Sequence, residues 1–306
     1  MKSKEIMVLF GPTAVGKTEI SLGVAKSLGG EILSADSMQI YQWMDIGSAK
    51  PTPEEQLVVP HHLVDEIDPR YPFSVADYQK KAKEAIENMF SRGKLPIVSG
   101  GTGLYINSLI YDMDFGKNQG DSDFRKKMEK FALEKGNEEL HGLLMAKDPK
   151  AGRQIHPNNV KKVIRALERW ETEGEIKPFR DNLRPTKDYK VLMIGLKRNR
   201  DQLYHRIEKR VDGFIQAGLV EEVEKLLGRG LSPKDISMKG IGYKEIIPFL
   251  EGKVSLEEAR EEIKKNTRNL AKRQMTWFRS YSDVKWFDLS EIDHPVEEMV
   301  QWWKNR

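Results

Sequence analysis

The sequence contains no cysteine among its 306 residues, which excludes disulfide bonds and thiolate metal sites. It also lacks any apolar run long enough to span a bilayer. Only five residues precede the first apolar segment, and that segment is too short for a signal peptide. No internal repeat or low-complexity tract is visible. We therefore expect a soluble cytoplasmic protein with a substantial core and no membrane partner.

The sequence has little excess charge of either sign, since 51 Lys and Arg nearly balance 47 Asp and Glu and leave a net charge of +4. This small excess does not by itself indicate a nucleic-acid partner, but its distribution is uneven. Residues 264–279 include six basic residues and no acidic one, and Lys161, Arg165 and Arg169 recur every four residues, as on one helix face. Taken alone, the first cluster is explained by the basic end of a helix, and the second by a solvated helix face. Two such clusters on one chain favour an extended polyanion as partner.

A complete phosphate-binding motif follows the apolar segment 6–10. Its glycines let the backbone curl so that successive N–H groups point at phosphate oxygens, Lys17 adds a positive charge, and the Thr18 hydroxyl can bind Mg²⁺. The motif consists of Gly11, Pro12, Thr13, Ala14, Val15, Gly16, Lys17 and Thr18. A helical apolar pattern follows it, which is the context that such a loop requires. The sequence therefore predicts a site for a ligand with two or more phosphates.

Strand-like and helical segments alternate along most of the chain, which predicts an α/β fold with a parallel sheet flanked by helices. The expected strands are residues 6–10, 31–34, 63–67, 95–99, 191–196 and 286–289, and the expected helices are 17–28, 74–92, 203–216, 219–227 and 255–280. Between residues 115 and 185 the alternation stops and short polar helical stretches follow. We interpret 115–185 as a helical insertion domain in a core formed by residues 1–114 and 186–306.

Asp36 directly follows the expected strand 31–34, so it lies at the edge of the sheet where the phosphate loop also opens. It is a candidate catalytic carboxylate, although a helix cap or an indirect Mg²⁺ anchor would also explain it. The glycine-rich run 99–103 ends another apolar strand and permits close approach of a ligand or of another backbone.

Several longer motifs give the chain a resemblance to the bacterial tRNA dimethylallyltransferases, also called tRNA isopentenyltransferases. The motifs are GPTAVGKT at 11–18, DSMQIYQWMDIGSAKP at 36–51, GGTGLY at 100–105, HPNN at 156–159, RALE at 165–168, RIEKRVD at 206–212, GIGYKE at 240–245 and TRNLAKRQMTWFR at 267–279. They follow one another in order over nearly the whole chain. The resemblance implies a phosphate-loop nucleotide-binding fold with an all-helical insertion.

The resemblance also implies an activity and its residues. A dimethylallyl group would pass from dimethylallyl diphosphate to N6 of the adenosine just 3′ of a tRNA anticodon, adenosine 37. Lys17, Arg210 and the phosphate loop would hold the diphosphate with Mg²⁺ bound at Thr18, and Asp36 would be the general base. The insertion would clasp the anticodon stem-loop, and we expect a monomer. The family positions that contact tRNA correspond to Asp36, Ser37, Met38, Gln39, Gly101, Thr102, Lys161, Lys162, Arg165, Arg273 and Gln274.

Two residues depart from the family pattern. Lys162 stands where the family usually has arginine, which keeps the charge but loses a planar fork, and Asn159 stands where aspartate is common. Both changes concern tRNA contact and leave the chemistry alone.

Other functions remain compatible with the phosphate loop. A kinase of a small molecule or nucleotide would use the loop on ATP, and an adenylate isopentenyltransferase would modify a free nucleotide. A non-enzymatic RNA-binding protein would have no use for Asp36. The insertion and the two basic clusters favour a large acceptor over a free nucleotide.

Overall fold

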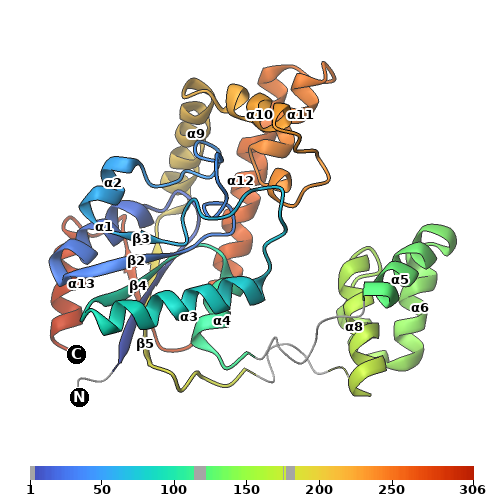
Figure 1. Ribbon diagram of the computed structural model, residues 1–306, viewed down its shortest axis with the longest axis horizontal. Coiled ribbons are helices and arrows are strands. Elements are labelled where there is room, and N and C mark those ends of the chain that lie inside the picture. Colours follow the sequence, from blue (N-terminus) through green and yellow to red (C-terminus); the bar gives the residue numbers. More distant parts are fainter. Residues whose placement is uncertain (1–3, 114–121, 175, 177–182) are drawn as a thin grey trace. The chain divides into compact units, whose positions relative to one another are not determined.

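A computed structural model describes residues 4–113, 122–174, 176 and 183–306. It divides the chain into two compact units, one of residues 1–110 with 186–306 and one of residues 111–185. Figure 1 shows a single sheet in the first unit. All its neighbouring strands run parallel, in the order β3-β2-β4-β1-β5-β6. The strands are β1 Glu5–Phe10, β2 Gly30–Ala35, β3 His61–His62, β4 Leu95–Gly100, β5 Lys190–Lys197 and β6 Val284–Asp288. The expected parallel α/β fold is thus confirmed.

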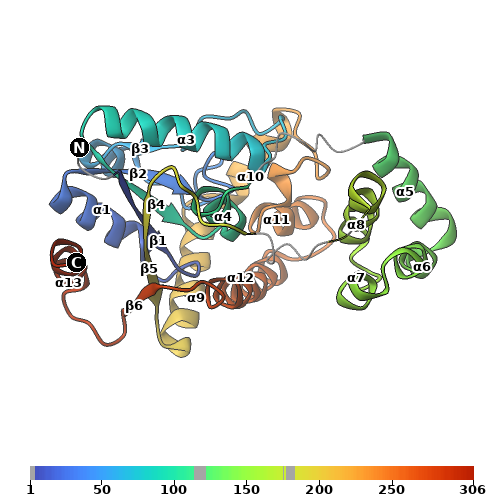
Figure 2. The same cartoon turned by 90° about the horizontal axis from the view of Figure 1, so that it is seen from below.

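Helices cover both faces of this sheet. Figure 2 shows α1 and α13 on one side and α4 and α12 on the other. The helices of the first unit are α1 Lys17–Leu28, α2 Pro53–Val58, α3 Val75–Ser91, α4 Gly103–Ile110, α9 Arg200–Gln216, α10 Leu219–Gly228, α11 Tyr243–Leu250, α12 Leu256–Phe278 and α13 Pro295–Lys304, with a short 3-10 turn at Ser237–Lys239. Apolar side chains of β1, β4, β5, α1 and α13 form one buried cluster, which fixes α1 against the sheet.

Because the strands are parallel, the carboxyl ends of β1, β2 and β4 meet at one edge of the sheet, the edge where ligands bind in open α/β sheets. Residue pairs such as Phe10 with Gly100 and Ala35 with Gly100 bring these ends into register. A side-chain Cβ at Gly100 would lie 2.2 Å from the Ala35 carbonyl oxygen, so glycine is required for this approach. The phosphate loop, Asp36 and Thr102 therefore begin from adjacent positions.

The strand expected at residues 63–67 is wrong. The observed strand is the shorter β3, and the chain leaves the extended conformation immediately after it, since Leu63 and Asp65 have φ of 58° and 61°. The backbone of Asp65, Glu66 and Ile67 instead donates hydrogen bonds to the carbonyls of Gln39 and Ile40. The segment 63–67 includes the apolar residues Leu63 and Val64, but its hydrogen-bond partners lie in the loop after β2.

The second unit is helical and has its own core. It contains α5 Ser122–Lys135, α6 Asn137–Lys147, α7 Pro149–Gln154 and α8 Val160–Glu173. Buried side chains of these helices pack together around Leu140, Leu144 and Val163. Arg125 of α5 forms a bidentate hydrogen-bonded ion pair with Glu168 of α8, with N–O distances of 2.9–3.0 Å.

No helix in the described part of the chain combines the length and the apolar composition that a bilayer span requires.

Candidate functional site

The phosphate loop connects β1 to the amino end of α1. Ala14 and Gly16 adopt left-handed φ values of 62° and 117°, which curl the loop around its own N–H groups. The Lys17 ammonium lies inside this curl and donates hydrogen bonds of 2.9 Å to the carbonyls of Gly11 and Pro12. The first turn of α1 contributes further free N–H groups and the positive end of the helix dipole. The predicted loop residues thus form a cradle whose geometry and charge suit an anion.

Three arginines from the segment around α9 surround this loop. Arg210 Nη1 lies 3.5 Å from the Thr13 hydroxyl, Arg206 donates a 2.9 Å hydrogen bond to the Ala14 carbonyl, and Arg198 lies 3.4 Å from the Val15 carbonyl. Arg198 is not recognisable from the sequence because no motif marks it. These cations would add positive charge around a bound diphosphate.

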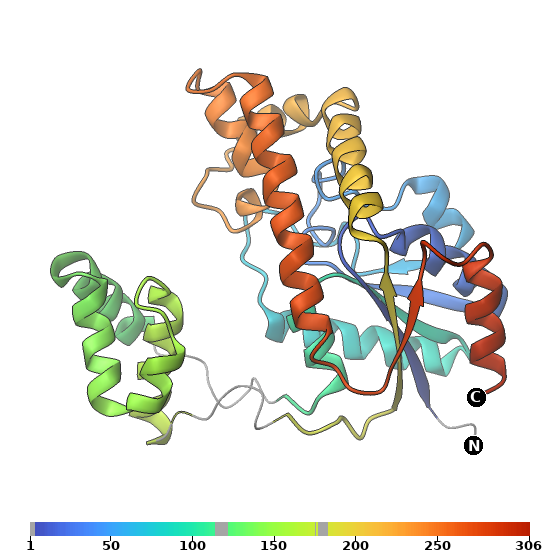
Figure 3. The same cartoon turned by 180° about the vertical axis from the view of Figure 1, so that it is seen from behind.

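Ion pairs to Glu208 or Asp212 do not explain Arg210. Glu208 pairs with Arg268 at 2.9 Å, and Asp212 pairs with Lys264 at 2.9 Å. Figure 3 shows α12, which carries Arg268 and Lys264, beside α9. Arg210 instead stacks its guanidinium over the Phe214 ring, 5.3 Å from the centroid, and faces the loop.

The Lys17 ammonium has an unusual pKa because of its surroundings in the loop. Desolvation by burial is the main cause that lowers the pKa of Lys17 from its ordinary 10.5 to about 7; the Asp36 carboxylate opposes this shift and the Arg210 guanidinium adds to it. A bound diphosphate would bring negative charge next to the ammonium and raise its pKa again. Anion binding should therefore be linked to uptake of a proton by Lys17.

This linkage predicts a pH dependence for binding of inorganic pyrophosphate. Without a bound anion, the Lys17 ammonium keeps its proton below pH ~7 and loses it above, so binding of pyrophosphate should weaken as pH rises through this value. Lys17→Arg is the reference protein, because arginine stays charged over this range. The ratio of the wild-type Kd to the Kd of Lys17→Arg removes the titration of pyrophosphate itself, and we expect it to rise up to about tenfold per pH unit above ~7. Isothermal titration calorimetry between pH 6 and 9 measures it. A flat ratio would contradict the placement of Lys17 against the anion.

The turn after β2 presents the next group of predicted residues. Asp36 Oδ1 accepts a 2.9 Å hydrogen bond from the Met38 N–H, which fixes the carboxyl group and leaves its other oxygen free of hydrogen bonds among the described residues. The Ser37 N–H donates to the Thr102 hydroxyl at 3.1 Å, and the Thr102 N–H donates to the Ala35 carbonyl at 3.0 Å. Asp36, Ser37, Met38 and Thr102 therefore lie together at the ends of β2 and β4.

A small cavity of about 40 Å³ joins the phosphate loop to Asp36. Its lining residues are Lys17, Thr18, Ser21, Ile32, Ser34, Asp36, Gln39, Pro51, His61, Ser99 and Gly100. Most of the side-chain atoms in this lining that can bind a metal ion are hydroxyl, carboxylate and amide oxygens, which suit a hard cation such as Mg²⁺. No group of three or more His, Cys, Asp or Glu side chains suited to a metal occurs in the described residues, so diphosphate oxygens would have to complete the coordination.

His61 is a member of this cavity that the sequence did not single out. Its Nδ1 lies 2.8 Å from the Val59 carbonyl, and burial, the largest cause, lowers its pKa from the ordinary value. Its strand partner in β2 is Ile32, which lies on the same side of the sheet. Only the pairing of β3 with β2 brings His61 here.

Gln274 of α12 links two of the predicted loops. Its Oε1 accepts a 2.8 Å hydrogen bond from the Thr13 N–H, and its Nε2 donates a 3.0 Å hydrogen bond to the Gly101 carbonyl. A Cβ at Gly101 would lie 2.4 Å from Gln274 Nε2, so the absence of a side chain allows this contact. Both polar ends of Gln274 are used within the protein, and its role in binding tRNA stays a prediction.

The loop that starts at Asp36 is anchored to α10 by a carboxylate that sequence reasoning missed. Glu222 accepts hydrogen bonds of 2.8–3.1 Å from the N–H groups of Asp45, Ile46 and Gly47, and one of 2.8 Å from the Tyr243 hydroxyl. The MDIGSAKP and GIGYKE motifs therefore meet through Glu222. Glu222 lies 175–177 positions from these N–H groups along the chain, so the sequence carries no local signal for the contact.

The two basic clusters differ in their availability. Lys264 and Arg268 of α12 form the ion pairs described above, and Lys265 pairs with Glu262 at 3.0 Å. These three side chains are thus held in ion pairs, and the role of the run 264–279 in binding a polyanion stays a prediction. Within these two clusters, the exposed basic side chains that have no ion pair among the described residues are Lys272 and Arg273 of α12, Arg279 just after α12, and Lys161, Lys162, Arg165 and Arg169 of α8. The free cations of the two clusters therefore lie at the end of α12 and on one face of α8.

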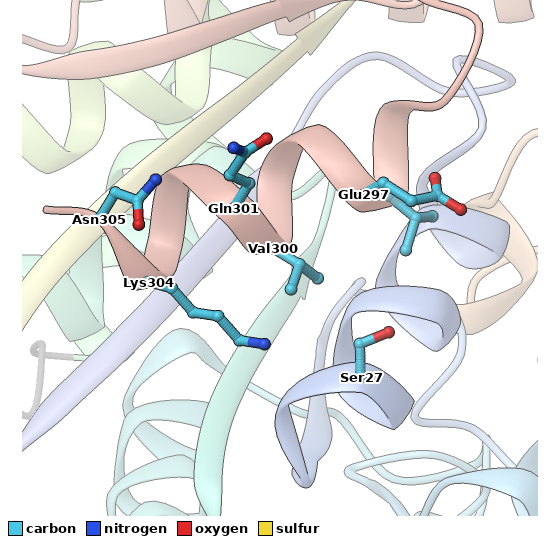
Figure 4. A pocket seen from close by; sticks show the side chains of 7 residues that line it. Ser27, Glu297, Val300, Gln301, Lys304 and Asn305 are labelled. Atoms are coloured by element: carbon cyan, nitrogen blue, oxygen red, sulfur yellow. The ribbon is translucent and has the colours of Figure 1, made fainter.

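A larger cavity of about 370 Å³ lies away from these residues. Figure 4 shows it between Ser27, in the last turn of α1, and the α13 side chains Glu297, Val300, Gln301 and Lys304. Lys17 and Thr18 occupy the opposite end of the 12-residue α1, about 14 Å away along the helix. This cavity is separate from the phosphate loop.

Comparison with known proteins decides the family. The family model described as IPP transferase matches residues 39–281. The chain belongs to the IPP transferase family. It is thus an enzyme of the prenyltransferase class. The tRNA dimethylallyltransferase of Alkaliphilus oremlandii (strain OhILAs) is 53% identical over 291 residues, which cover 95% of this chain and 93% of the relative. That of Clostridioides difficile (strain 630) is 47% identical over 299 residues, covering 98% and 96%.

Solved structures agree with this IPP transferase assignment. The full-length tRNA isopentenylpyrophosphate transferase from Bacillus halodurans has 44% identity and a TM-score of 0.75, covering 98% of this chain and 96% of its own. A eukaryotic dimethylallyltransferase acting on tRNA has 27% identity and a TM-score of 0.81, covering 99% of this chain and 76% of its own. The resemblance found in the sequence motifs is confirmed.

Proposed function

We propose that this protein transfers a dimethylallyl group from dimethylallyl diphosphate to N6 of adenosine 37, next to the anticodon of tRNA, and releases pyrophosphate. One observation carries the proposal: a single cavity joins a phosphate-binding loop to a fixed carboxylate, Asp36. The names of the relatives, tRNA dimethylallyltransferases, support the choice of substrates.

The phosphate loop would hold the leaving group. When the allylic carbon–oxygen bond breaks, negative charge develops on the pyrophosphate oxygens. The loop N–H groups, the Lys17 ammonium and the Arg210 guanidinium, which lie together at this loop, would stabilise this charge. Thr18, with Ser34 and Ser99 nearby in the cavity, would hold Mg²⁺, which supplies further neutralisation of the diphosphate. No phosphoryl group is transferred in this reaction.

Asp36 would act on the acceptor. The adenine N6 amine is a poor nucleophile because its lone pair is delocalised into the ring, and it must lose a proton as the new bond to carbon forms. The Asp36 oxygen that accepts no hydrogen bond can orient the amine and take this proton. Thr102, whose hydroxyl holds the Ser37 backbone, lies beside it to contact the base.

The target base has to leave the anticodon loop to reach this position. Extrusion from a single-stranded loop costs a few kcal/mol at most, which RNA contacts elsewhere offset. The exposed cations Arg273 of α12 and Lys161, Lys162 and Arg165 of α8 are suited to bind the phosphate backbone, and affinity should then fall with salt. Ser37, Met38, Gln39 and Gly101 would contact the base and its neighbours.

The reaction is tested by incubating the protein with unmodified tRNA, Mg²⁺ and dimethylallyl diphosphate in the absence of ATP. We expect a mass gain of one prenyl unit on adenosine, and none on a tRNA in which adenosine 37 is replaced by guanosine, since guanosine lacks the N6 amine. Nucleoside mass spectrometry reads both. No gain on any tRNA, with ATP hydrolysed or transferred in a parallel tube, would instead indicate a kinase.

A further inference from the structure

Trp43 adopts a backbone conformation that disfavours its side chain. Its φ is 63°, in the left-handed region that bulky residues avoid and glycine adopts freely. It belongs to the loop that begins at Asp36 and follows that residue by seven positions. Strained residues of this kind persist where the surrounding structure holds them, and they concentrate at binding sites. The strain alone shows only that Trp43 is fixed.

The indole carries an exposed cation on one face. The Arg229 guanidinium, just after the end of α10, lies 4.3 Å from the centroid of the Trp43 ring. Arg229 is exposed and has no ion pair among the described residues, and Trp43 itself is only partly buried. A guanidinium over an indole ring combines an aromatic surface with positive charge, and surfaces of this type bind unpaired nucleobases.

Contacts on both sides of Trp43 hold this surface in place. The Gln42 N–H donates to the Ile67 carbonyl at 2.8 Å, and Met44 is fully buried. The next residues, 45–47, are bound by Glu222 of α10, the helix that ends beside Arg229. The loop and α10 therefore hold Trp43 and Arg229 against each other.

The distance to the proposed acceptor site is limited by the chain. Seven residues span at most about 25 Å when fully extended, and the turn at 38–41, closed by the Tyr41 N–H and the Met38 carbonyl, shortens this. Bases next to the extruded adenosine would lie within this range, and each would lose a stacking partner when the adenosine leaves the stack. A new stacking surface would therefore stabilise these bases.

We propose that Trp43 and Arg229 form a stacking platform for an unpaired base of the anticodon loop that neighbours the target adenosine. This inference rests on the proposed function, because it takes the bound RNA to be that loop. Indole and guanidinium planes stack on any base, so the platform positions the loop without reading its sequence.

Trp43→Gly separates this role from a purely structural one. Glycine relieves the strain of the left-handed φ, which opposes the loss of the packing of the indole, so the protein should remain folded, whereas the Kd for an anticodon stem-loop RNA should increase about 5- to 100-fold. Trp43→Phe keeps a ring and should retain most of the affinity. Trp303→Phe is the matched control, because Trp303 also stacks with an arginine, Arg306, at 3.5 Å but lies on α13. Fluorescence anisotropy without dimethylallyl diphosphate measures these affinities.

Abasic substitution at each loop position then identifies the stacked base. Its removal should weaken binding to the wild type and leave binding to Trp43→Gly unchanged. Equal affinity of Trp43→Gly and wild type, or abasic effects that are the same in both proteins at every position, would overturn the platform. If the wild type fails to prenylate tRNA but Trp43→Gly still loses affinity for one base, the proposed function is wrong and the platform stands.

Discussion

Replacing Asp36 by asparagine is expected to lower kcat for prenyl transfer about 10²- to 10⁴-fold. Asparagine keeps an Oδ1 that can accept the Met38 N–H, so the turn after β2 should be preserved, but it cannot take the proton from N6. The Kd for tRNA should stay within about threefold of wild type. Single-turnover rates with saturating tRNA and donor measure the effect.

Asp36→Ala provides the comparison that separates chemistry from geometry. It removes both the base and the acceptor for the Met38 N–H, so it should lose the same rate as Asp36→Asn and some tRNA affinity in addition. A rate for Asp36→Asn near that of wild type would place the base elsewhere. A loss of tRNA affinity that matches the lost rate would reduce Asp36 to a binding residue.

Replacing Arg210 by alanine should lower kcat/KM for dimethylallyl diphosphate about 10²- to 10³-fold. The guanidinium faces Thr13 of the phosphate loop and has no carboxylate partner in the described residues, so its charge is available to the diphosphate. Arg210→Lys should recover part of the activity, because it keeps the charge but not the planar fork. Steady-state kinetics at saturating tRNA measures both variants.

Arg268→Ala is the matched control for Arg210. Arg268 lies on the neighbouring helix α12 and is used in an ion pair with Glu208 of α9, away from the loop. Its loss should change kcat/KM for the donor less than about threefold. Equal effects of Arg210→Ala and Arg268→Ala would mean that Arg210 supports α9 and does not touch the diphosphate.

Sequence reasoning reached those parts of the site that local pattern determines. The phosphate loop has a fixed spacing between β1 and α1, and Asp36 follows an apolar strand, so both could be placed at the carboxyl edge of a parallel sheet. The segment 63–67 could not be placed, because its hydrogen bonds go to Gln39 and Ile40, and only tertiary structure selects these partners.

Long-range contacts account for the rest. Gln274 reaches Thr13 across 261 residues, and Glu222 reaches Gly47 across 175. Nothing in the spacing of the chain predicts either contact. The ion pairs in the basic run 264–279 could not be predicted for a similar reason, since Asp212 and Glu208, which pair with Lys264 and Arg268, lie on α9.

The central claim is that the phosphate loop holds the leaving group of an alkyl transfer to tRNA. The measurement that tests it most directly uses dimethylallyl diphosphate with ¹⁸O in the oxygen that joins carbon to phosphorus, incubated with the protein, Mg²⁺ and tRNA. Cleavage of the carbon–oxygen bond predicts that all the label appears in pyrophosphate, with one prenylated adenosine for each pyrophosphate released. Label in dimethylallyl alcohol, or a phosphorylated acceptor, would show cleavage at phosphorus and contradict the claim.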